Sequence, residues 1–517
     1  MQFNKPQFKS LHLLLIILIA GGISIFAFAP FNHSYIMAVT ILMLLYVIDN
    51  FAAYVSKKKL FAYGYFFGFT YFATQLYWAF YSLYKIIDTG LIISTLAYIF
   101  FVGFLALYMG LIVTVYHKYK TKFAIVNLAV FFPSVWVFFE WLRSWLFSGF
   151  PWCEVGYTQV NISFLKGFYP LGGSYLVSWI FLSMIGAFYF IIKNKILFIT
   201  SRNISNIPPK RYTNLILFYF LAIIIGGDFL AKINYTKPYG KPISVALIQG
   251  NISQGVKWSS NNFLDIYKKE IALAHADIVI IPETAISSFS EYLPVGYLDG
   301  LVKTAKTNGA NLIIGIPKFI DKQNNYVNSA LLLTDPKQSY YAKYHLVPYG
   351  EYIPMKWLFG KVYSMINLPL VGFSSGGKEQ SPLVVANQKL AFNICYENGF
   401  NTELTANAMQ STILANLSDM VWYGDTVAKD QHLQISQVRA LENQRYFIQD
   451  TNTGLTAIIT PNGMIQSKLA PFVKGTLTDM VQGRFGATPF EIVGNYPIII
   501  ICALFIFIFI GFRRFKK

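Results

Sequence analysis

Cysteine is scarce in this chain, with three among 517 residues, at Cys153, Cys395 and Cys502. Cys502 lies in the last apolar run and Cys153 in a loop between two others, so neither is an obvious disulfide partner for Cys395. The spacing of His, Cys, Asp and Glu follows no metal-ligand pattern, and we expect neither a metal nor another cofactor. A lone cysteine in a globular domain is either a buried apolar residue or a reactive one.

Charge is scarce as well. Only 13% of the residues are charged, whereas 55% are hydrophobic and 18% are aromatic. This composition excludes an intrinsically disordered chain and exceeds the apolar content of an ordinary soluble domain. The sequence contains no internal repeat and no low-complexity tract.

Long apolar runs are plentiful, and eight of them could cross a bilayer. The first is not expected to be a cleaved signal peptide, because seven more runs follow it without a convincing cleavage site. Within the third run, Gly64 and Gly68 have the GxxxG spacing that lets helices pack closely. We predict about eight spans, near residues 10–28, 34–50, 60–84, 89–116, 123–147, 171–192, 213–231 and 496–513.

Lysine and arginine are distributed unevenly around these predicted spans. With the amino terminus inside, seventeen cations fall on the cytoplasmic side, and four (Lys85, Arg143, Lys166 and Lys232) fall on the other. The positive-inside rule then places residues 233–494 outside the cytoplasm.

The formal net charge of +18 could suggest a nucleic-acid partner. Residues 233–494, however, hold 21 Lys and Arg against 19 Asp and Glu, so most of the excess lies in membrane loops. There it suits anionic phospholipid headgroups, and we expect no binding of nucleic acid.

The chain divides into three predicted parts. Residues 1–232 form a transmembrane helical bundle of about seven spans, residues 233–494 an extracytoplasmic domain, and residues 495–517 a last transmembrane helix with a basic cytoplasmic tail. In the middle part, apolar strand-like runs alternate with helical patterns, which is typical of an α/β fold whose sheet is covered by helices. Strands are predicted at 243–249, 278–281, 312–316, 330–334, 383–385, 390–394, 412–416 and 455–460, helices at 260–274, 296–307, 400–409 and 430–444, and a hairpin turn at Pro461-Asn-Gly463.

Three reactive side chains follow strand-like runs of this middle part. Glu283 ends Val279-Ile-Ile-Pro-Glu283, Lys343 follows Tyr340-Tyr-Ala, and Cys395 follows Ala391-Phe-Asn-Ile. A thiolate can attack an acyl carbon, a carboxylate can move protons, and an ammonium can stabilise negative charge, so the sequence predicts covalent acyl chemistry at a membrane. We expect Lys343 to lower the pKa of the Cys395 thiol by about two units, which takes roughly 2.7 kcal/mol.

These residues resemble the Glu-Lys-Cys triad of the nitrilase superfamily and, more narrowly, the apolipoprotein N-acyltransferase family. The resemblance covers nearly the whole chain, apolar runs included, whereas soluble nitrilases lack such runs. One departure is Asp419-Met420 before Val421-Trp422-Tyr423, where the family usually reads Asn-Asp before Ala-Trp-Phe. The matching segments are Pro282-Glu283, Lys343-Tyr-His-Leu-Val-Pro-Tyr-Gly-Glu-Tyr-Ile-Pro354, Cys395-Tyr-Glu397, Gln249-Gly-Asn-Ile252, Lys257-Trp258, Glu140-Trp-Leu-Arg-Ser-Trp-Leu-Phe-Ser-Gly-Phe-Pro-Trp152, Gly156-Tyr157 and Ala440-Leu-Glu442.

The resemblance implies a nitrilase-like α-β-β-α sandwich inserted in the transmembrane bundle. It implies Glu283 as general base, Lys343 as electrostatic stabiliser and Cys395 as nucleophile. It further implies supporting roles in the active site for Glu351, Tyr396 and Glu397, and contact with lipid or substrate for Trp258, Trp422 and Arg143.

The activity implied by the resemblance is transfer of a fatty acyl group from a membrane phospholipid to the N-terminal amine of the diacylglyceryl-cysteine of bacterial apolipoproteins. This is the last step of lipoprotein maturation, and it would proceed through a thioester on Cys395 in a ping-pong scheme. The expected location is the bacterial cytoplasmic (inner) membrane, with the catalytic domain on the periplasmic side. The aromatic segment 348–373 is expected to form a lid at the membrane interface.

Other interpretations remain open. A membrane-tethered amidase or nitrilase-type hydrolase would have the same triad but would use water in place of the amine. A non-enzymatic sensor or transporter is disfavoured, because a degenerate domain is expected to lose a triad member and all three are present. A Cys-His pair with His345 or His432 beside Cys395 is a further arrangement that suits a nucleophilic thiol.

Overall fold

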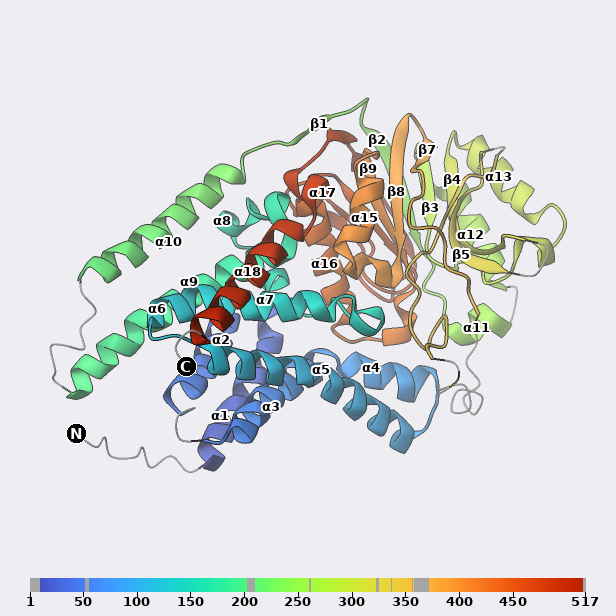
Figure 1. The fold of residues 1–517 in the computed structure, drawn as a ribbon. Coiled ribbons are helices and arrows are strands. Elements are labelled where there is room, and N and C mark those ends of the chain that lie inside the picture. Colours follow the sequence, from blue (N-terminus) through green and yellow to red (C-terminus); the bar gives the residue numbers. More distant parts are fainter. Residues whose placement is uncertain are drawn as a thin grey trace. The chain divides into compact units, whose positions relative to one another are not determined.

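The computed structural model groups the chain into two compact units (Figure 1). The helical unit comprises Met1–Phe80, Gly90–Ile233 and Asn495–Lys517, and the catalytic unit comprises Tyr81–Thr89 and Asn234–Gly494. The structure describes residues 10–51, 55–201, 210–259, 262–321, 325–335, 337–355, 357 and 372–514.

The helical unit is built from long apolar helices. Among the described residues, Leu91–Tyr119, Ala124–Arg143, Tyr169–Lys195 and Arg211–Leu230 are long and apolar enough to cross a membrane, and Leu11–Ala27, Ser34–Asn50 and Tyr496–Phe512 are shorter apolar helices. The helices are α1 (Ser10–Gly22), α2 (Ser34–Asn50), α3 (Lys57–Gln75), α4 (Tyr77–Tyr81), α5 (Leu91–Tyr119), α6 (Ala124–Val126), α7 (Phe132–Arg143), α8 (Ser163–Lys166), α9 (Tyr169–Ser201), α10 (Lys210–Leu230) and α18 (Tyr496–Arg514).

The predicted third span, 60–84, differs most from the structure. Helix α3 starts with three lysines and ends at Gln75, and a separate short helix, α4, follows it. Residues 81–89 group with the catalytic unit, where the ring of Tyr81 lies against Gly424: a Cβ added there would be 2.2 Å from it. The count of eight spans therefore stays a prediction.

The GxxxG pair in α3 lies at a close helix contact, as its spacing predicts. A Cβ added at Gly64 would lie 2.7 Å from the carbonyl oxygen of Met109, and one at Gly68 would lie 2.7 Å from the Cβ of Met109. Met109 belongs to α5, so the two glycines let the backbones of α3 and α5 approach each other.

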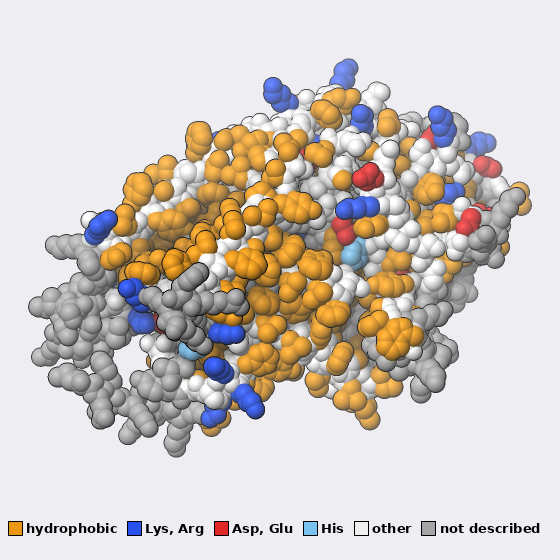
Figure 2. Space-filling view, viewed as in Figure 1, with side chains coloured by type: hydrophobic (Ala, Val, Ile, Leu, Met, Phe, Trp, Pro, Cys, Tyr) orange, Lys and Arg blue, Asp and Glu red, His pale blue; other side chains and the backbone are white. Residues whose placement is uncertain are grey.

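Hydrophobic side chains cover much of the visible face of the helical unit (Figure 2). On α10, Phe218 is 70% exposed and Phe229 is 66% exposed, and Phe507 on α18 is 70% exposed. Exposed apolar stripes of this length are costly in water but favourable against lipid, which agrees with a membrane protein.

The catalytic unit contains two six-stranded sheets and a two-stranded ribbon. One sheet has the order β13-β2-β3-β4-β5-β6, the other has the order β12-β11-β10-β9-β8-β7, and β1 pairs with β14. The strands are β1 (Thr236–Pro238), β2 (Ile243–Gln249), β3 (Ile278–Ile281), β4 (Asn311–Phe319), β5 (Tyr326–Leu332), β6 (Tyr340–Ala342), β7 (Leu383–Val385), β8 (Gln388–Ile394), β9 (Ile413–Ser418), β10 (Phe447–Thr451), β11 (Ala457–Ile459), β12 (Ile465–Lys468), β13 (Gly475–Val481) and β14 (Arg484–Gly486).

Helices cover the outer faces of both sheets (Figure 1). Strand β3 shows why: Ile278 and Ile280 lie in the core between the sheets, whereas Val279 and Ile281 pack beneath helices. Both faces of this strand are buried, so its sequence is apolar throughout. The helices are α11 (Gln254–Ser259), α12 (Asn262–Leu273), α13 (Tyr297–Thr307), α15 (Asn401–Ala408), α16 (Ala428–Asn443) and α17 (Pro489–Val493).

This arrangement is the predicted nitrilase-like sandwich of helix, sheet, sheet and helix, and its sheets are mixed. Strands β2, β3 and β4 run parallel in one sheet, and β8, β9 and β10 run parallel in the other. The predicted hairpin at Pro461-Asn-Gly463 joins the antiparallel strands β11 and β12, and Gly463 has the positive φ of +75° that such turns require. The polar ends of the parallel strands are where the candidate site lies.

Candidate active site

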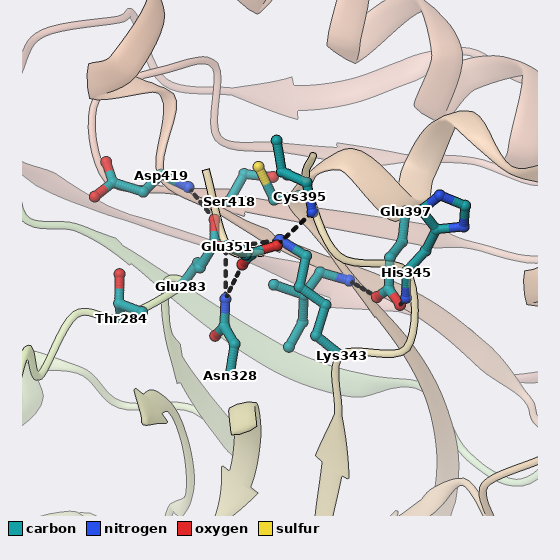
Figure 3. Close-up of polar contacts among 12 residues, drawn as sticks. Glu283, Thr284, Asn328, Lys343, His345, Glu351, Cys395, Glu397, Ser418 and Asp419 are labelled. Atoms are coloured by element: carbon teal, nitrogen blue, oxygen red, sulfur yellow. Dashed lines mark hydrogen bonds and ion pairs between the residues drawn. The ribbon is translucent and has the colours of Figure 1, made fainter. Parts of the chain in front are cut away.

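Cys395 lies where β8 ends and a single helical turn, Cys395–Gly399, begins. Its φ is +54°, a left-handed conformation that is strained for a residue with a side chain. Two side chains hold its carbonyl oxygen: Nδ2 of Asn416 at 3.4 Å and Nε2 of His432 at 3.2 Å. The turn is thus held by contacts from β9 and α16, and the sulfur is near enough to Glu283 and Lys343 for both charges to act on it (Figure 3).

Glu283 follows β3 after Pro282 and is buried, with 6% exposure. Its Oε1 accepts a hydrogen bond from Nδ2 of Asn328 at 2.8 Å, and its Oε2 accepts one from the backbone N–H of Asp419 at 2.8 Å. Asn328 lies in β5 and Asp419 directly follows β9, which are strands of different sheets, so the carboxylate is held between the two sheets (Figure 3).

Lys343 follows β6, and its side chain is 1% exposed. Its Nζ lies 2.9 Å from Oε1 of Glu351 and 3.4 Å from Oε1 of Glu283. A buried ammonium is stable only with such partners. Burial alone would lower the pKa of Lys343, but the carboxylates of Glu351 and Glu283 hold it well above its ordinary value, so the group stays charged.

The Cys395 thiol differs from the sequence expectation, which was wrong about the direction of its pKa shift. Burial, first, and then the charge of Glu283 raise the pKa of the thiol well above its ordinary value, and Lys343 offsets only part of this rise. Lys343 does not cancel the effect of burial, because it is shared between two carboxylates that are themselves negative. Cys395 is therefore a thiol at rest, and a thiol needs a base if it is to attack an acyl carbon.

Glu351 and Glu397 hold the loop that follows Lys343. Oε2 of Glu351 accepts from the N–H of Val347 at 2.8 Å. Oε1 of Glu397 accepts from the N–H groups of Tyr344 at 2.7 Å and His345 at 2.9 Å.

Glu397 also binds the strand that leads to Cys395, since its Oε2 accepts from the N–H of Ile394 at 2.6 Å. Burial raises the pKa of Glu397 to about 7, against the lowering effect of its backbone donors. This carboxylate thus connects the Cys395 turn to the Lys343 loop.

Tyr396 follows the nucleophile and packs through its ring. The ring meets Phe400 edge-on, with centroids 5.1 Å apart, and His345 with centroids 5.8 Å apart. The ring of His345 stacks on Phe400 at 3.7 Å, and its Nδ1 lies 2.9 Å from Oε1 of Glu403.

The structure favours no Cys-His pair. Nε2 of His432 contacts the carbonyl oxygen of Cys395, as described above, and its Nδ1 lies 3.1 Å from Oε1 of Gln449. Burial lowers the pKa of His432, so its imidazole stays neutral. Among the residues that the structure describes, no group of three His, Cys, Asp or Glu could hold a metal ion.

One contributor to the site, Asn328, was not singled out from the sequence, and another, Asp419, was noted only as a departure from the family motif. Asn328 donates to both Glu283 and Glu351, the latter at 3.3 Å. Asp419 supplies the second donor to Glu283 and pairs through its carboxylate with Lys257, which is 2% exposed. The available signals were the position of polar Asn328 within the buried strand β5 and the departure from the family motif at Asp419.

The three residues expected to contact lipid or substrate are not brought together by the described contacts. Arg143 lies in the helical unit, where its guanidinium is buried and donates to the carbonyl oxygens of Phe150 at 2.5 Å and Trp152 at 2.6 Å. Trp422 is half-buried in the turn Met420–Tyr423. The side chain of Trp258 lies outside the described part of the chain, as does most of the expected lid at 348–373.

Comparisons with known proteins assign the class first. Residues 244–490 match the family model described as "Carbon-nitrogen hydrolase", so the sandwich with its buried cysteine is a carbon-nitrogen hydrolase domain. Residues 20–188 match the model described as "Apolipoprotein N-acyltransferase N-terminal domain".

Relatives extend this match over the full length. An apolipoprotein N-acyltransferase of Chromobacterium violaceum is 37% identical over 98% of this chain and 95% of its own. One of Neisseria meningitidis is 35% identical over 97% of each chain. Among solved structures, the C. elegans NitFhit protein aligns with 49% of this chain and 62% of its own, at 16% identity and a TM-score of 0.35. The chain belongs to the apolipoprotein N-acyltransferase family and is an acyltransferase.

Proposed function

We propose that this protein transfers a fatty acyl group from a membrane phospholipid to the N-terminal amine of the diacylglyceryl-cysteine of apolipoproteins, as the last step of lipoprotein maturation. The single observation that carries the proposal is the meeting of Glu283, Lys343 and Cys395 at one buried point of the catalytic unit. The names of the full-length relatives support the acceptor.

In the first half-reaction, Glu283 takes the thiol proton while the sulfur of Cys395 attacks the ester carbonyl carbon. The thiol is protonated at rest, so proton removal and attack belong to one step. Lys343 stabilises the negative charge that develops on the carbonyl oxygen. When the ester C–O bond breaks, Glu283 returns the proton to the leaving alkoxide, which departs as a lysophospholipid and leaves a thioester.

In the second half-reaction, the lipoprotein amine attacks the thioester carbon. Glu283 takes a proton from the attacking nitrogen, and the C–S bond breaks as the amide forms. Glu283 then gives that proton to the sulfur of Cys395, which restores the resting thiol. One cysteine serves two bulky substrates only in turn, which gives a ping-pong scheme.

The remaining site residues have proposed supporting roles. Glu351 holds Lys343 in place, and Glu397 with Tyr396 holds the turn of the nucleophile. Trp258, Trp422 and Arg143 are proposed to contact lipid or substrate. Trp357, which is 83% exposed, and Tyr349, which is 43% exposed, suit the proposed lid at the membrane interface.

The proposed location is the bacterial inner membrane, with about eight spans, both termini in the cytoplasm and residues 233–494 on the periplasmic side. The distribution of Lys and Arg supports this orientation. A catalytic domain held at the bilayer surface keeps the acyl chain in an apolar environment, which slows the loss of the thioester to water.

The experiment is intact-mass analysis of the protein extracted from membranes. We expect a mass increment of one fatty acyl group that hydroxylamine removes and that Cys395→Ala abolishes. Cys502→Ala is the matched control, since Cys502 lies in α18 of the helical unit. A protein that turns over a small amide with water, and that never carries an acyl group from phospholipid, would instead be the membrane-tethered hydrolase.

A further inference from the structure

A second buried ion pair lies directly behind the proposed base. Nζ of Lys257 in α11 is 2.5 Å from Oδ2 of Asp419, and the two side chains are each 2% exposed. Lys257 also donates to Oγ1 of Thr284 at 2.9 Å and to the backbone carbonyl oxygen of Glu283 at 3.4 Å. The ammonium is therefore satisfied by three acceptors, two of which belong to Glu283 and the residue after it.

Asp419 contacts Glu283 from the opposite side. Its backbone N–H donates to Oε2 of Glu283 at 2.8 Å. Its carboxylate is held by Nδ2 of Asn452 at 3.1 Å and by Nε2 of Gln254 at 3.3 Å, in addition to Lys257. Lys257 thus contacts the main chain of Glu283, and Asp419 contacts its carboxylate. The pair is held by residues of α11, of the turn after β9 and of the segment after β10.

Burying two charges is costly, and such a pair often stabilises a fold no better than apolar residues of the same size. Its position suggests what it does instead. An uncompensated ammonium beside Glu283 would stabilise the ionised carboxylate and make it a weaker base, whereas an uncompensated carboxylate would have the reverse effect. Together, Lys257 and Asp419 carry no net charge, so they leave the basicity of Glu283 unchanged and still supply its hydrogen bonds.

We propose that Lys257 and Asp419 are positioning residues that aim Glu283 at the Cys395 thiol and balance each other's charge beside it. The inference rests on the proposed function, because it takes Glu283 as the base. It predicts that loss of the Asp419 charge makes Glu283 a weaker base and that loss of the Lys257 charge makes it a stronger one.

Other charged and titratable groups also act on Glu283, and the two substitutions leave all of them unchanged. They are Lys343 after β6, Glu351 in the loop that follows, Cys395 at the end of β8, Tyr423 in the turn after β9 and His432 in α16. A shift that reverses sign between the two variants therefore reports the pair itself.

The test is the rate at which iodoacetamide alkylates Cys395 in the full-length protein from about pH 5 to about pH 9, with the modified cysteine identified by peptide mass. We expect Asp419→Asn to move the midpoint of the acidic limb down by about one pH unit and Lys257→Met to move it up by about one. The double variant, which again has no net charge there, is expected to restore the midpoint while retaining a lower plateau rate.

Midpoints that stay unchanged in both single variants, or that move in the same direction, would overturn the proposal. Lys257→Met alone leaves the buried Asp419 carboxylate uncompensated; if it does not fold, Asp419→Asn and the double variant carry the test, because neither contains that carboxylate, and unchanged midpoints in Asp419→Asn would overturn the proposal. The proposed function is checked separately by acyl-enzyme formation in the unsubstituted protein. Shifted midpoints without any acyl-enzyme would refute the function and leave the positioning role in place.

Discussion

Lys343 contacts two carboxylates at once, those of Glu351 and Glu283, and this arrangement determines how Cys395 reacts. A lone ammonium would favour a thiolate at rest, whereas burial together with a shared ammonium leaves the sulfur protonated, and in the proposed mechanism Glu283 then removes the proton. A protonated resting thiol is less exposed to oxidation and to reaction with wrong electrophiles, since the thiolate is the reactive form. In the proposed mechanism, catalysis then depends on the position of one carboxylate, that of Glu283.

Lys343→Ala is expected to slow alkylation of Cys395 at neutral pH by about tenfold or more, because the sulfur loses its one stabilising charge. Removal of the ammonium also leaves Glu283 and Glu351 close together through Asn328, which favours protonation of one of them. Lys389→Ala is the control, since that lysine is exposed on β8. Equal alkylation rates in Lys343→Ala and the unsubstituted protein would refute the assigned role.

At the scale of elements, strand β10 carries a carboxyl that takes no part in the site. Among the described residues, Asp450 is fully buried and neither of its side-chain oxygens has a hydrogen-bond partner. Burial raises the pKa of Asp450 well above its ordinary value, so the group is held as a neutral acid.

The sign of the pH effect follows from this shift. The folded protein binds the Asp450 proton more tightly than the unfolded chain does. The contribution of this group to the free energy of unfolding is therefore fully present at low pH. It is lost as pH rises toward the raised pKa, at about 1.4 kcal/mol per pH unit. Asp450→Asn cannot ionise. We expect its thermal midpoint, relative to the unsubstituted protein, to improve between about pH 5 and about pH 8. A constant difference would contradict the assignment.

Helices α3 and α5 provide a second test at this scale. Gly64→Val places a side chain where a Cβ alone would lie 2.7 Å from a carbonyl oxygen, so the helices must separate, at about 2 kcal/mol or more. Gly226→Ala in α10 is the control, because no heavy atom lies within 4 Å of the added Cβ and the helix gains a better helix former. In detergent, the thermal midpoint of Gly64→Val should lie below that of the unsubstituted protein, and the midpoint of Gly226→Ala should lie above it. Equal midpoints would show that the α3–α5 contact is not close-packed.

At the scale of the whole molecule, one chain forms two units whose surfaces differ in composition. The helical unit exposes apolar side chains, whereas the catalytic unit contains two buried sheets between helices. The catalytic unit also takes in Tyr81–Thr89, a segment that lies between two apolar helices in the sequence.

The orientation of the chain is testable with reporter fusions. A reporter after Lys517 or within residues 196–210 is expected to behave as cytoplasmic, because the cations concentrate on that side. A fusion within residues 233–494 should report the periplasm. Periplasmic activity at either of the first two points would overturn the orientation and the functional proposal built on it.

Much of the fold was predictable because the signals are local. Apolar runs and their charged flanks indicate membrane helices, and alternation of short apolar runs with amphipathic patterns indicates an α/β domain. The helices predicted at 296–307 and 400–409 agree with α13 (Tyr297–Thr307) and α15 (Asn401–Ala408) to within a residue at each end. Strands β1, β10, β12, β13 and β14 were not predicted. Strand β10 is central and buried, but three of its five residues, Gln449, Asp450 and Thr451, are polar. Strand β13 alternates partly exposed residues at a sheet edge, and β1, β12 and β14 span only three or four residues.

The sequence by itself predicted which residues are proposed to carry the chemistry, since Glu283, Lys343 and Cys395 each follow a buried strand in a recognisable motif. The tertiary structure decided their charge states. Lys343 is compensated twice, Cys395 is protonated, and the Lys257–Asp419 pair lies behind the base, although these partners are tens to hundreds of residues apart in the chain. Electrostatic effects depend on distance and burial in three dimensions, and neither quantity exists until the two sheets are packed together.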